Sequence, residues 1–239
     1  PMGILNCVGL QNPGVDRFIQ EEIPYLRQFD TKIIANVSGH SVEEYVGIVE
    51  KISDADIDLI EMNISCPNVK CGGLTFGTQP KMVEEVVSAA KAVAKKPLIV
   101  KLTPNVTDIA EIARAAVSAG ADALSLINTL LGMRIDVESR RPILSNIMGG
   151  LSGPAVFPVA VRMVYQVRQA VDVPIIGMGG IRTGRDIVEM MLAGANAVAI
   201  GTACFADPMA PIKALHELDA FCDSHGIKSV TELTGAVRL

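Results

Sequence analysis

The sequence predicts an α/β fold, namely a TIM (β/α)8 barrel from which about the first two strands are missing. Short apolar runs alternate with segments of helical periodicity, which indicates parallel strands joined by crossover helices. The runs contain little polar alternation, as is typical of strands covered on both faces. The 239 residues are close to the roughly 250 of such a barrel. We therefore expect residues 1–239 to form a single barrel domain.

The predicted elements follow one another in a regular order. After a loop and a helix over 15–29, the strands are expected at 32–37, 58–64, 97–102, 123–127, 174–178 and 197–201. The helices between them begin after Ser41 and then cover 82–94, 108–119, 155–171, 185–193 and 211–224. Ser41 and Glu44 form a capping-box pattern at the first of these starts.

Two stretches of the chain look like copies of one βαβ unit. Gly120 and Gly194 end their helices in the similar contexts Ser-Ala-Gly-Ala-Asp-Ala and Leu-Ala-Gly-Ala-Asn-Ala, where glycine supplies a left-handed cap. A proline begins the preceding strand in each copy, so that 97–128 matches 174–202. Internal duplication of this kind suits a barrel.

Six strands cannot close an eight-stranded barrel, and an open one exposes two unpaired edges. We therefore expect about two βα units to be absent at the N-terminal side. The alternative is an open, doubly wound sheet.

Composition excludes several classes of protein. The formal charge is −5, and the basic residues are scattered, so no stripe is available for nucleic acid. The apolar runs are far shorter than the ~20 residues that span a bilayer, and no leader pattern begins the chain, so we expect a cytoplasmic protein without a membrane segment. Five cysteines without paired spacing make a disulfide framework improbable, and no metal site is predicted.

Polar residues or glycines follow every predicted strand. In barrel enzymes the reacting groups lie at these carboxyl ends. A single asparagine there would be explained by turn formation, but agreement among the strands favours a site. The residues are Asn36, Asn63 to Asn68, Lys101 with Thr103, Asn128 with Thr129, Gly179 with Gly180, and Gly201 with Thr202.

Lys101 emerges from an apolar strand, and a buried lysine needs an anionic partner. The neighbouring sequence offers no obvious carboxylate, which leaves a bound anion or an electron-rich cofactor; alternatively the side chain extends to solvent. The glycines at 149–153, 179–180 and 201 would present backbone N–H groups at helix starts and bind a phosphate, unless they only form tight turns.

Cys66 follows a strand end and precedes Pro67, in a segment up to Gly77 that we expect to be a mobile lid. The thiol could be a general base, a nucleophile, a metal ligand together with Cys71, or a small buried group without a role.

Three segments carry a resemblance to a known family. Asn-Ile-Ser-Cys-Pro-Asn at 63–68, Asn-Cys-Val-Gly-Leu-Gln-Asn at 6–12 and Ile-Asn-Thr at 127–129 resemble the class 1 dihydroorotate dehydrogenases, and the likeness runs along the whole chain. The membrane-bound class carries serine where this chain has Cys66. The stretches 68–73 and 9–14 look more like the NAD-linked subclass than the fumarate-linked one.

The resemblance implies an FMN-containing barrel that oxidises dihydroorotate to orotate in pyrimidine biosynthesis. Cys66 would then be the general base that removes a proton from the substrate while a hydride passes to the flavin. The implied substrate-binding residues are Asn6, Val8, Gly9, Leu10, Asn63, Asn68, Asn128 and Thr129. Lys101, Asn36, Asn63 and Ile127 would contact the flavin ring, and Gly153, Gly179, Gly180, Gly201 and Thr202 its phosphate and ribityl chain.

The same resemblance implies a homodimer and, for the NAD-linked subclass, a second subunit with FAD and an iron–sulfur cluster. This chain carries neither a Gly-x-Gly-x-x-Gly motif nor a cysteine cluster, as expected if another subunit holds those groups. An early lysine and glycine of the family have no counterpart here. Two other hypotheses stay open: a non-redox, phosphate-binding TIM-barrel lyase or isomerase that uses Lys101, and a non-catalytic fragment that serves as a scaffold.

Overall fold

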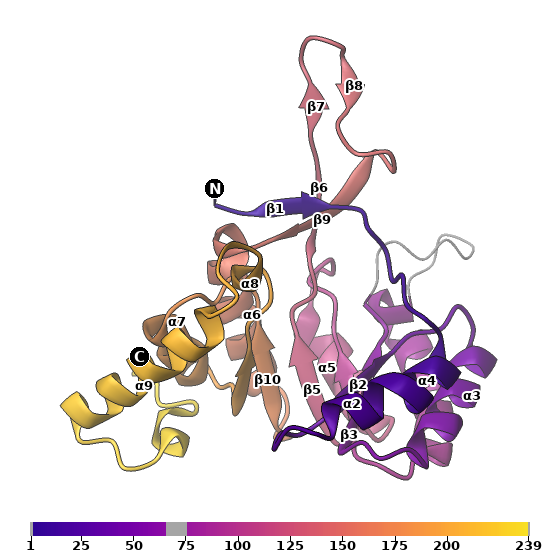
Figure 1. Ribbon diagram of the computed structural model, residues 1–239, viewed down its shortest axis with the longest axis horizontal. Coiled ribbons are helices and arrows are strands. Elements are labelled where there is room, and N and C mark those ends of the chain that lie inside the picture. Colours follow the sequence, from indigo (N-terminus) through magenta and orange to yellow (C-terminus); the bar gives the residue numbers. More distant parts are fainter. Residues whose placement is uncertain (1, 66–75, 239) are drawn as a thin grey trace.

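The computed structural model describes residues 2–65 and 76–238, and its main feature is a six-stranded parallel sheet (Figure 1). The strand order is β11-β10-β5-β4-β3-β2, and every neighbouring pair is parallel. All six predicted strands are confirmed, as β2 (Ile34–Val37), β3 (Leu59–Asn63), β4 (Leu98–Lys101), β5 (Ala123–Leu126), β10 (Ile175–Met178) and β11 (Ala197–Ala199).

The order of the strands distinguishes a barrel from a doubly wound sheet. Within this sheet the order follows the chain without reversing, whereas a doubly wound sheet reverses at a switch point. The alternative of a doubly wound sheet is therefore wrong. Along the described chain, no strand pairs with the outer edge of β2 or of β11. The sheet is thus an open part of a (β/α)8 barrel.

The crossover helices pack against one another in chain order. Those of the sheet are α3 (Val42–Ser53), α4 (Pro80–Val93), α5 (Ile109–Ser118), α6 (Phe157–Arg168) and α7 (Gly184–Leu192), and α9 (Ala210–His225) then packs on α7. The remaining helical segments are α1 (Val15–Arg17), η1 (Phe18–Glu22), α2 (Ile23–Leu26), η2 (Phe76–Thr78), η3 (Pro154–Val156), α8 (Ala203–Ala206) and η4 (Val230–Leu233). No helix in 2–65 or 76–238 is both long and apolar enough to cross a membrane.

Strands also form where loops were expected. The opening stretch contains β1 (Ile4–Asn6), and the long gap between β5 and α6 contains β6 (Leu130–Met133), β7 (Ile135–Asp136), β8 (Arg141–Pro142) and β9 (Met148–Ser152). An antiparallel sheet of order β1-β9-β6 lies beyond the carboxyl ends of the parallel strands, and the β7–β8 hairpin projects from it (Figure 1).

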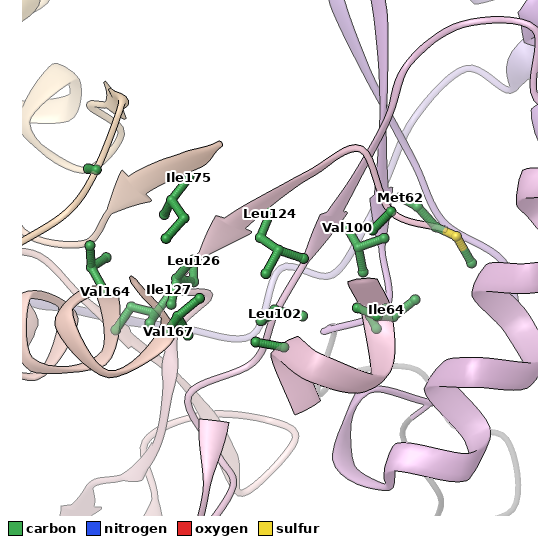
Figure 2. Packing of buried hydrophobic residues seen from close by; sticks show 14 of the residues in the cluster. Met62, Ile64, Val100, Leu102, Leu124, Leu126, Ile127, Val164, Val167 and Ile175 are labelled. Atoms are coloured by element: carbon green, nitrogen blue, oxygen red, sulfur yellow. The ribbon is translucent and has the colours of Figure 1, made fainter. Parts of the chain in front are cut away.

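The core lies between the parallel sheet and its helices. Val100, Leu124 and Leu126 are fully buried on the helix-facing side of their strands, and Val164 and Val167 of α6 belong to the same cluster (Figure 2). Fully burying one such side chain contributes roughly 1.5–3 kcal/mol. The opposite face of β3, β4 and β5 is more polar than the sequence predicted, because Glu61, Asn63, Lys101 and Ser125 lie on it.

Matching side chains hold the amino ends of the strands in register. The carboxylate Oδ2 of Asp58 accepts from Ile33 N at 2.9 Å, Asp122 Oδ2 accepts from Leu98 N at 2.6 Å, and Asn196 Oδ1 accepts from Ile175 N at 3.0 Å. Asp122 and Asn196 are the matching residues of the two sequence copies, so the duplicated pattern has a structural reason. Gly120 and Gly194 both have positive φ, as predicted.

Not every cap forms as expected. Ser41 Oγ accepts from Glu44 N, but the Glu44 carboxylate accepts from His40 N and not from Ser41 N. The predicted capping box is therefore only half present.

The strand-start carboxylate of Asp58 also has a shifted pKa. The hydrogen bond from Ile33 N, together with Lys32 and Arg27, lowers the pKa of Asp58 to about 2.

Candidate functional site

A cleft of about 430 Å³ lies at the carboxyl ends of the parallel strands. This volume falls in the range of roughly 300–1,000 Å³ that is typical of small-molecule sites. Strand-end residues predicted from the sequence gather along it, namely Lys101, Ile127, Asn128, Thr129, Gly179, Gly180, Gly201 and Thr202. The peptide bond between Leu126 and Ile127 at its wall is cis.

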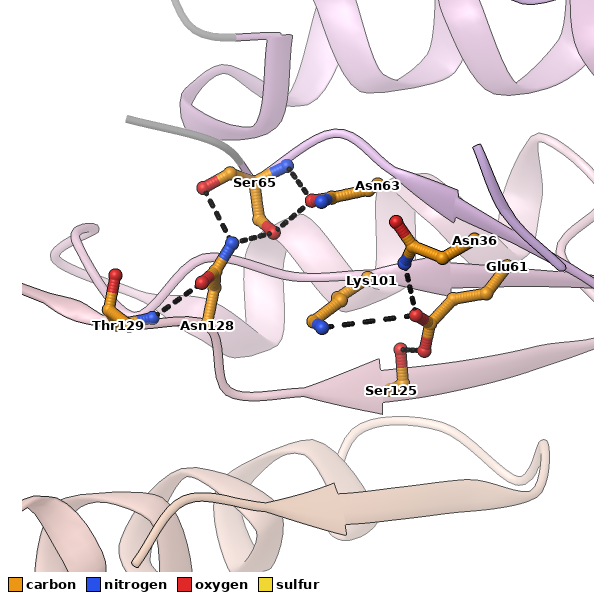
Figure 3. Close-up of polar contacts among 8 residues, drawn as sticks. All are labelled: Asn36, Glu61, Asn63, Ser65, Lys101, Ser125, Asn128 and Thr129. Carbon is orange, nitrogen blue, oxygen red and sulfur yellow. Dashed lines mark hydrogen bonds and ion pairs between the residues drawn. The ribbon is translucent and has the colours of Figure 1, made fainter. Parts of the chain in front are cut away.

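A buried carboxylate lies beside the predicted lysine (Figure 3). Glu61 Oε2 is 3.8 Å from Lys101 Nζ, Ser125 Oγ donates to Glu61 Oε1 at 2.7 Å, and Asn36 Nδ2 donates to Oε2. The expectation that Lys101 has no carboxylate partner is therefore wrong. The partner was missed because it lies 40 positions earlier in the chain, on the adjacent strand, where register and not proximity in sequence brings the two together.

A second cluster joins the ends of β3 and β5 through Ser65. Its hydroxyl donates to Asn63 Oδ1 at 2.7 Å and accepts from Asn128 Nδ2 at 2.8 Å (Figure 3). Asn128 Oδ1 in turn accepts from Thr129 N at 2.7 Å. The amide of Asn128, which lines the cleft, and that of Asn63, which lies behind it, therefore have fixed orientations. Rigid amides of this kind suit a planar ligand with alternating donors and acceptors.

Asn105 fixes the backbone of the loop that follows Asn128. Its Nδ2 donates to Thr129 O at 3.0 Å, and its Oδ1 accepts from Leu131 N at 2.9 Å. Thr103 Oγ1 accepts from Asn105 N at 3.2 Å. The start of β6 is thereby tied to the loop after β4.

Gly179, Gly180 and Gly201 line the cleft, whereas Gly153 packs against Gly180 without lining it. A Cβ on Gly180, which has φ +81°, would come within 2.7 Å of Gly153 O, and a Cβ on Gly153 would lie 3.4 Å from Thr202 Cγ2. A Cβ on Gly201 would meet no atom within 4 Å, so open space adjoins it. Thr202 Oγ1 donates to Ser152 Oγ at 2.9 Å.

One glycine cluster does not have the predicted form. Of residues 149–153, the first four belong to β9, and only Gly153 stands at a helix start. The glycines at 149 and 150 allow close approach instead, because a Cβ on Gly150 would overlap Thr129 Oγ1. Backbone N–H groups of a paired strand are not free to bind phosphate in the way that we expected.

Other predicted residues lie outside this cleft. Gly9, Leu10 and Asn36 line a separate cavity of about 500 Å³ beneath the N-terminal segment, and Val8 is exposed. Asn6 belongs to β1, where its Nδ2 donates to Gly150 O at 3.5 Å. Asn63 does not line the cleft, but Ser65 joins it by hydrogen bonds to Asn128, which does. Cys66, Asn68, Cys71 and most of the expected lid lie outside the described residues.

Sequence reasoning missed three residues that build the site, namely Glu61, Ser125 and Asn105, and it named Ser65 among the strand-end residues without giving it a role. Glu61 pairs with Lys101, and Ser125 hydrogen bonds to Glu61. Ser65 and Asn105 hydrogen bond to Asn128 and Thr129. A usable signal exists for two of them. Glu61 and Ser125 are polar residues inside otherwise apolar strands, and Glu61 shares its face with Asn63 because side chains on a strand alternate.

Comparison with known proteins identifies the family. The family model described as Dihydroorotate dehydrogenase matches residues 1–222. The chain belongs to the dihydroorotate dehydrogenase family. It is 62% identical over 235 residues to the "Dihydroorotate dehydrogenase B (NAD(+)), catalytic subunit" of Alkaliphilus metalliredigens, covering 98% of this chain and 78% of that protein. It is 55% identical to the protein of the same name from Geobacillus kaustophilus, covering 98% and 75%.

A solved dihydroorotate dehydrogenase has the same fold. The structure from Eimeria tenella, in complex with ferulenol, superposes with a TM-score of 0.80 at 24% identity and covers 98% of this chain and 71% of that one. The barrel fold predicted from the sequence is thereby confirmed, and the match to the family model confirms the predicted family. The polar cleft at the carboxyl ends of the strands is accordingly the candidate active site of a dihydroorotate dehydrogenase.

Proposed function

We propose that the cleft binds FMN and that Cys66 is the general base in the oxidation of dihydroorotate to orotate, a step of pyrimidine biosynthesis. The reaction follows from membership of the dihydroorotate dehydrogenase family. The observation that carries the site is that Lys101, Asn128 and Gly180 line one cleft. Family membership does not favour the alternative of a non-redox lyase or isomerase.

The residues at the cleft fit a flavin nucleotide. Gly179 and Gly180 have positive φ, and open space adjoins Gly201, so a phosphate could approach the backbone there. Lys101 supplies a positive charge at the same cleft, beside Ile127. Bound FMN would supply the acceptor for the hydride that leaves the substrate.

The chain's own groups have separable tasks in this proposal. Asn128 and Asn63, held by Ser65, orient the substrate through their amides, together with Thr129. Cys66 directly follows Ser65 in the chain and removes the substrate proton at its sulfur. Lys101 would hold the flavin ring through its positive charge and would favour negative charge there.

The relatives' names suggest where the electrons go. Those proteins are called catalytic subunits of an NAD(+) enzyme. We propose that this chain likewise works with a second subunit, which carries FAD and an iron–sulfur cluster, and that NAD⁺ is the final acceptor. A homodimer of the catalytic chain belongs to the same proposal.

Anaerobic mixing with dihydroorotate tests the proposal. The FMN-loaded protein should lose its visible flavin absorption within seconds. Cys66→Ala should keep FMN but bleach at least about a hundredfold more slowly, the usual scale for a lost general base. The matched control is Cys222→Ala on α9, which should bleach at the normal rate.

Three results would count against parts of the proposal. Equal bleaching rates for Cys66→Ala and the unsubstituted protein would remove Cys66 from the mechanism. Bound FMN that is not bleached by dihydroorotate would refute the substrate. Failure of the purified protein to bind FMN would refute the cofactor.

A further inference from the structure

Glu61 is a buried carboxylate that the proposed reaction does not use. It lies in the middle of β3 with 9% of its surface exposed, and it lines the same cleft as Lys101. An unpaired ionised carboxylate is costly to bury, so its partners indicate what holds it there. Those partners are Asn36 on β2, Ser125 on β5 and Lys101 on β4 (Figure 3).

The contact between Glu61 and Lys101 differs from the other two. At 3.8 Å from Oε2 to Nζ it is too long for a hydrogen bond, whereas Ser125 and Asn36 do hydrogen bond to the carboxylate. The attraction is therefore one of charge. Within the described residues no hydrogen bond uses the Lys101 ammonium, which leaves its N–H groups available to a ligand in the cleft.

The arrangement holds the carboxylate more firmly than the lysine. Asn36 on the neighbouring strand β2 and Ser125 on β5, one strand beyond β4, fix Glu61 by hydrogen bonds, and the flexible end of Lys101 is drawn toward that fixed charge. The pair carries no net charge as long as both groups are ionised. The electrostatic field at the cleft therefore depends on both residues, not on the lysine alone.

We propose that Glu61 is a positioning residue that fixes the Lys101 ammonium and offsets its charge, and thereby sets the reduction potential of the bound flavin. The inference rests on the proposed FMN site. A lysine without a carboxylate partner would stabilise the reduced, negatively charged flavin more strongly than the Lys101–Glu61 pair does, because the negative charge of Glu61 repels the reduced flavin. Glu61 accordingly keeps the flavin more strongly reducing.

Three variants test the proposal by redox titration of bound FMN. Glu61→Gln should raise the affinity for reduced relative to oxidised FMN about tenfold, which is ~30 mV for a two-electron couple. Lys101→Met should change that ratio about tenfold in the opposite direction. The double variant, again without net charge, should return to within about threefold of the unsubstituted protein.

Ser125→Ala is the control for simple damage to the cluster. It removes one hydrogen bond to Glu61 and leaves both charges, so the affinity ratio should change less than about threefold while the thermal midpoint falls. If Glu61→Gln lowers stability without changing the ratio, Glu61 is only a structural residue and the proposal is wrong.

The remaining outcomes distinguish failure of the Glu61 proposal from failure of the proposed FMN site. Opposite shifts in the single variants that fail to cancel in the double variant would also overturn the proposal. If Glu61→Gln fails to fold, Lys101→Met and the double variant still decide, since the proposal requires their ratios to differ by about tenfold. Absence of FMN from the unsubstituted protein would instead refute the cofactor, and this inference with it.

Discussion

Replacing Ser65 by alanine should weaken both the fold and the binding of orotate. The Ser65 hydroxyl is buried, with 2% of the residue exposed, and it makes hydrogen bonds of 2.7 Å to Asn63 and 2.8 Å from Asn128. Each such bond contributes about 0.5–1.5 kcal/mol net, so the substitution should cost about 1–3 kcal/mol of unfolding free energy. For a chain of this size that lowers the thermal midpoint by several degrees.

The effect on the ligand has a different origin. Among the described residues, loss of Ser65 Oγ leaves Asn128 Nδ2 with the Ser65 carbonyl at 3.3 Å and Asn63 Oδ1 with Ser65 N at 3.2 Å. Asn128 Oδ1 still accepts from Thr129 N, so both amides are held less firmly in their orientations. We expect orotate to bind at least about tenfold more weakly, because 1.4 kcal/mol of lost preorganisation corresponds to that factor.

Urea denaturation and orotate titration of the FMN-loaded protein measure the two effects. The matched control is Ser53→Ala on α3, since Ser53 is equally buried and its hydroxyl also makes two hydrogen bonds, to Val49 O at 2.7 Å and from Lys95 N at 3.1 Å. Both variants should lose similar stability, but only Ser65→Ala should lose orotate affinity. Equal orotate affinity in the two variants would refute the substrate role of the amides, and unchanged stability of Ser65→Ala would refute the hydrogen-bonded bridge.

Two other predictions concern the frame of the site. Gly180→Ala should cost more than about 1 kcal/mol of unfolding free energy and reduce FMN retention, because φ is +81° and the new methyl would lie 2.7 Å from Gly153 O. The control is Gly47→Ala at an exposed position of α3, which meets no atom within 4 Å and should be neutral or stabilising; equal stabilities of the two variants would contradict this cause. The pKa of Asp58 is lowered to about 2 by Ile33 N, Lys32 and Arg27, so its carboxylate stabilises the fold above the unfolded pKa near 4 and this contribution is lost as pH falls toward 2. Asp58→Asn should therefore be less stable than the unsubstituted protein at pH 7, with a gap that narrows between about pH 4 and 2 in acid titrations; a constant gap would exclude the linkage.

The parallel strands could be predicted because their apolar runs are local signals. Residues 98–100 and 124–127 are buried, and burial selects residue type wherever it occurs in the chain. β1 and β9 carry no comparable signal. Their pairing joins Asn6 to Gly150, 144 residues apart, and the glycines of β9 favour a loop when only local propensity is considered.

The site likewise contains positions that local sequence predicts and contacts that only the strand register determines. The positions of Lys101 and Asn128 at the cleft could be predicted because both end a strand, and strand ends of a parallel sheet share one edge. The contact of Lys101 with Glu61 could not, because it depends on which residues of β3 and β4 lie side by side. The register pairs Asn63 with Lys101, which places Glu61 two residues deeper on the same face.

The strand-start bonds of Asp58, Asp122 and Asn196 lie at the edge of the sheet opposite the cleft. Each hydrogen bond joins the start of one strand to the start of the preceding strand, at the end of the sheet away from the cleft. Loops at the cleft can therefore gain, lose or exchange residues during evolution without loosening the alignment of the strands beneath them. Substrate range is open to change in this scaffold, whereas strand alignment is protected by three short side chains.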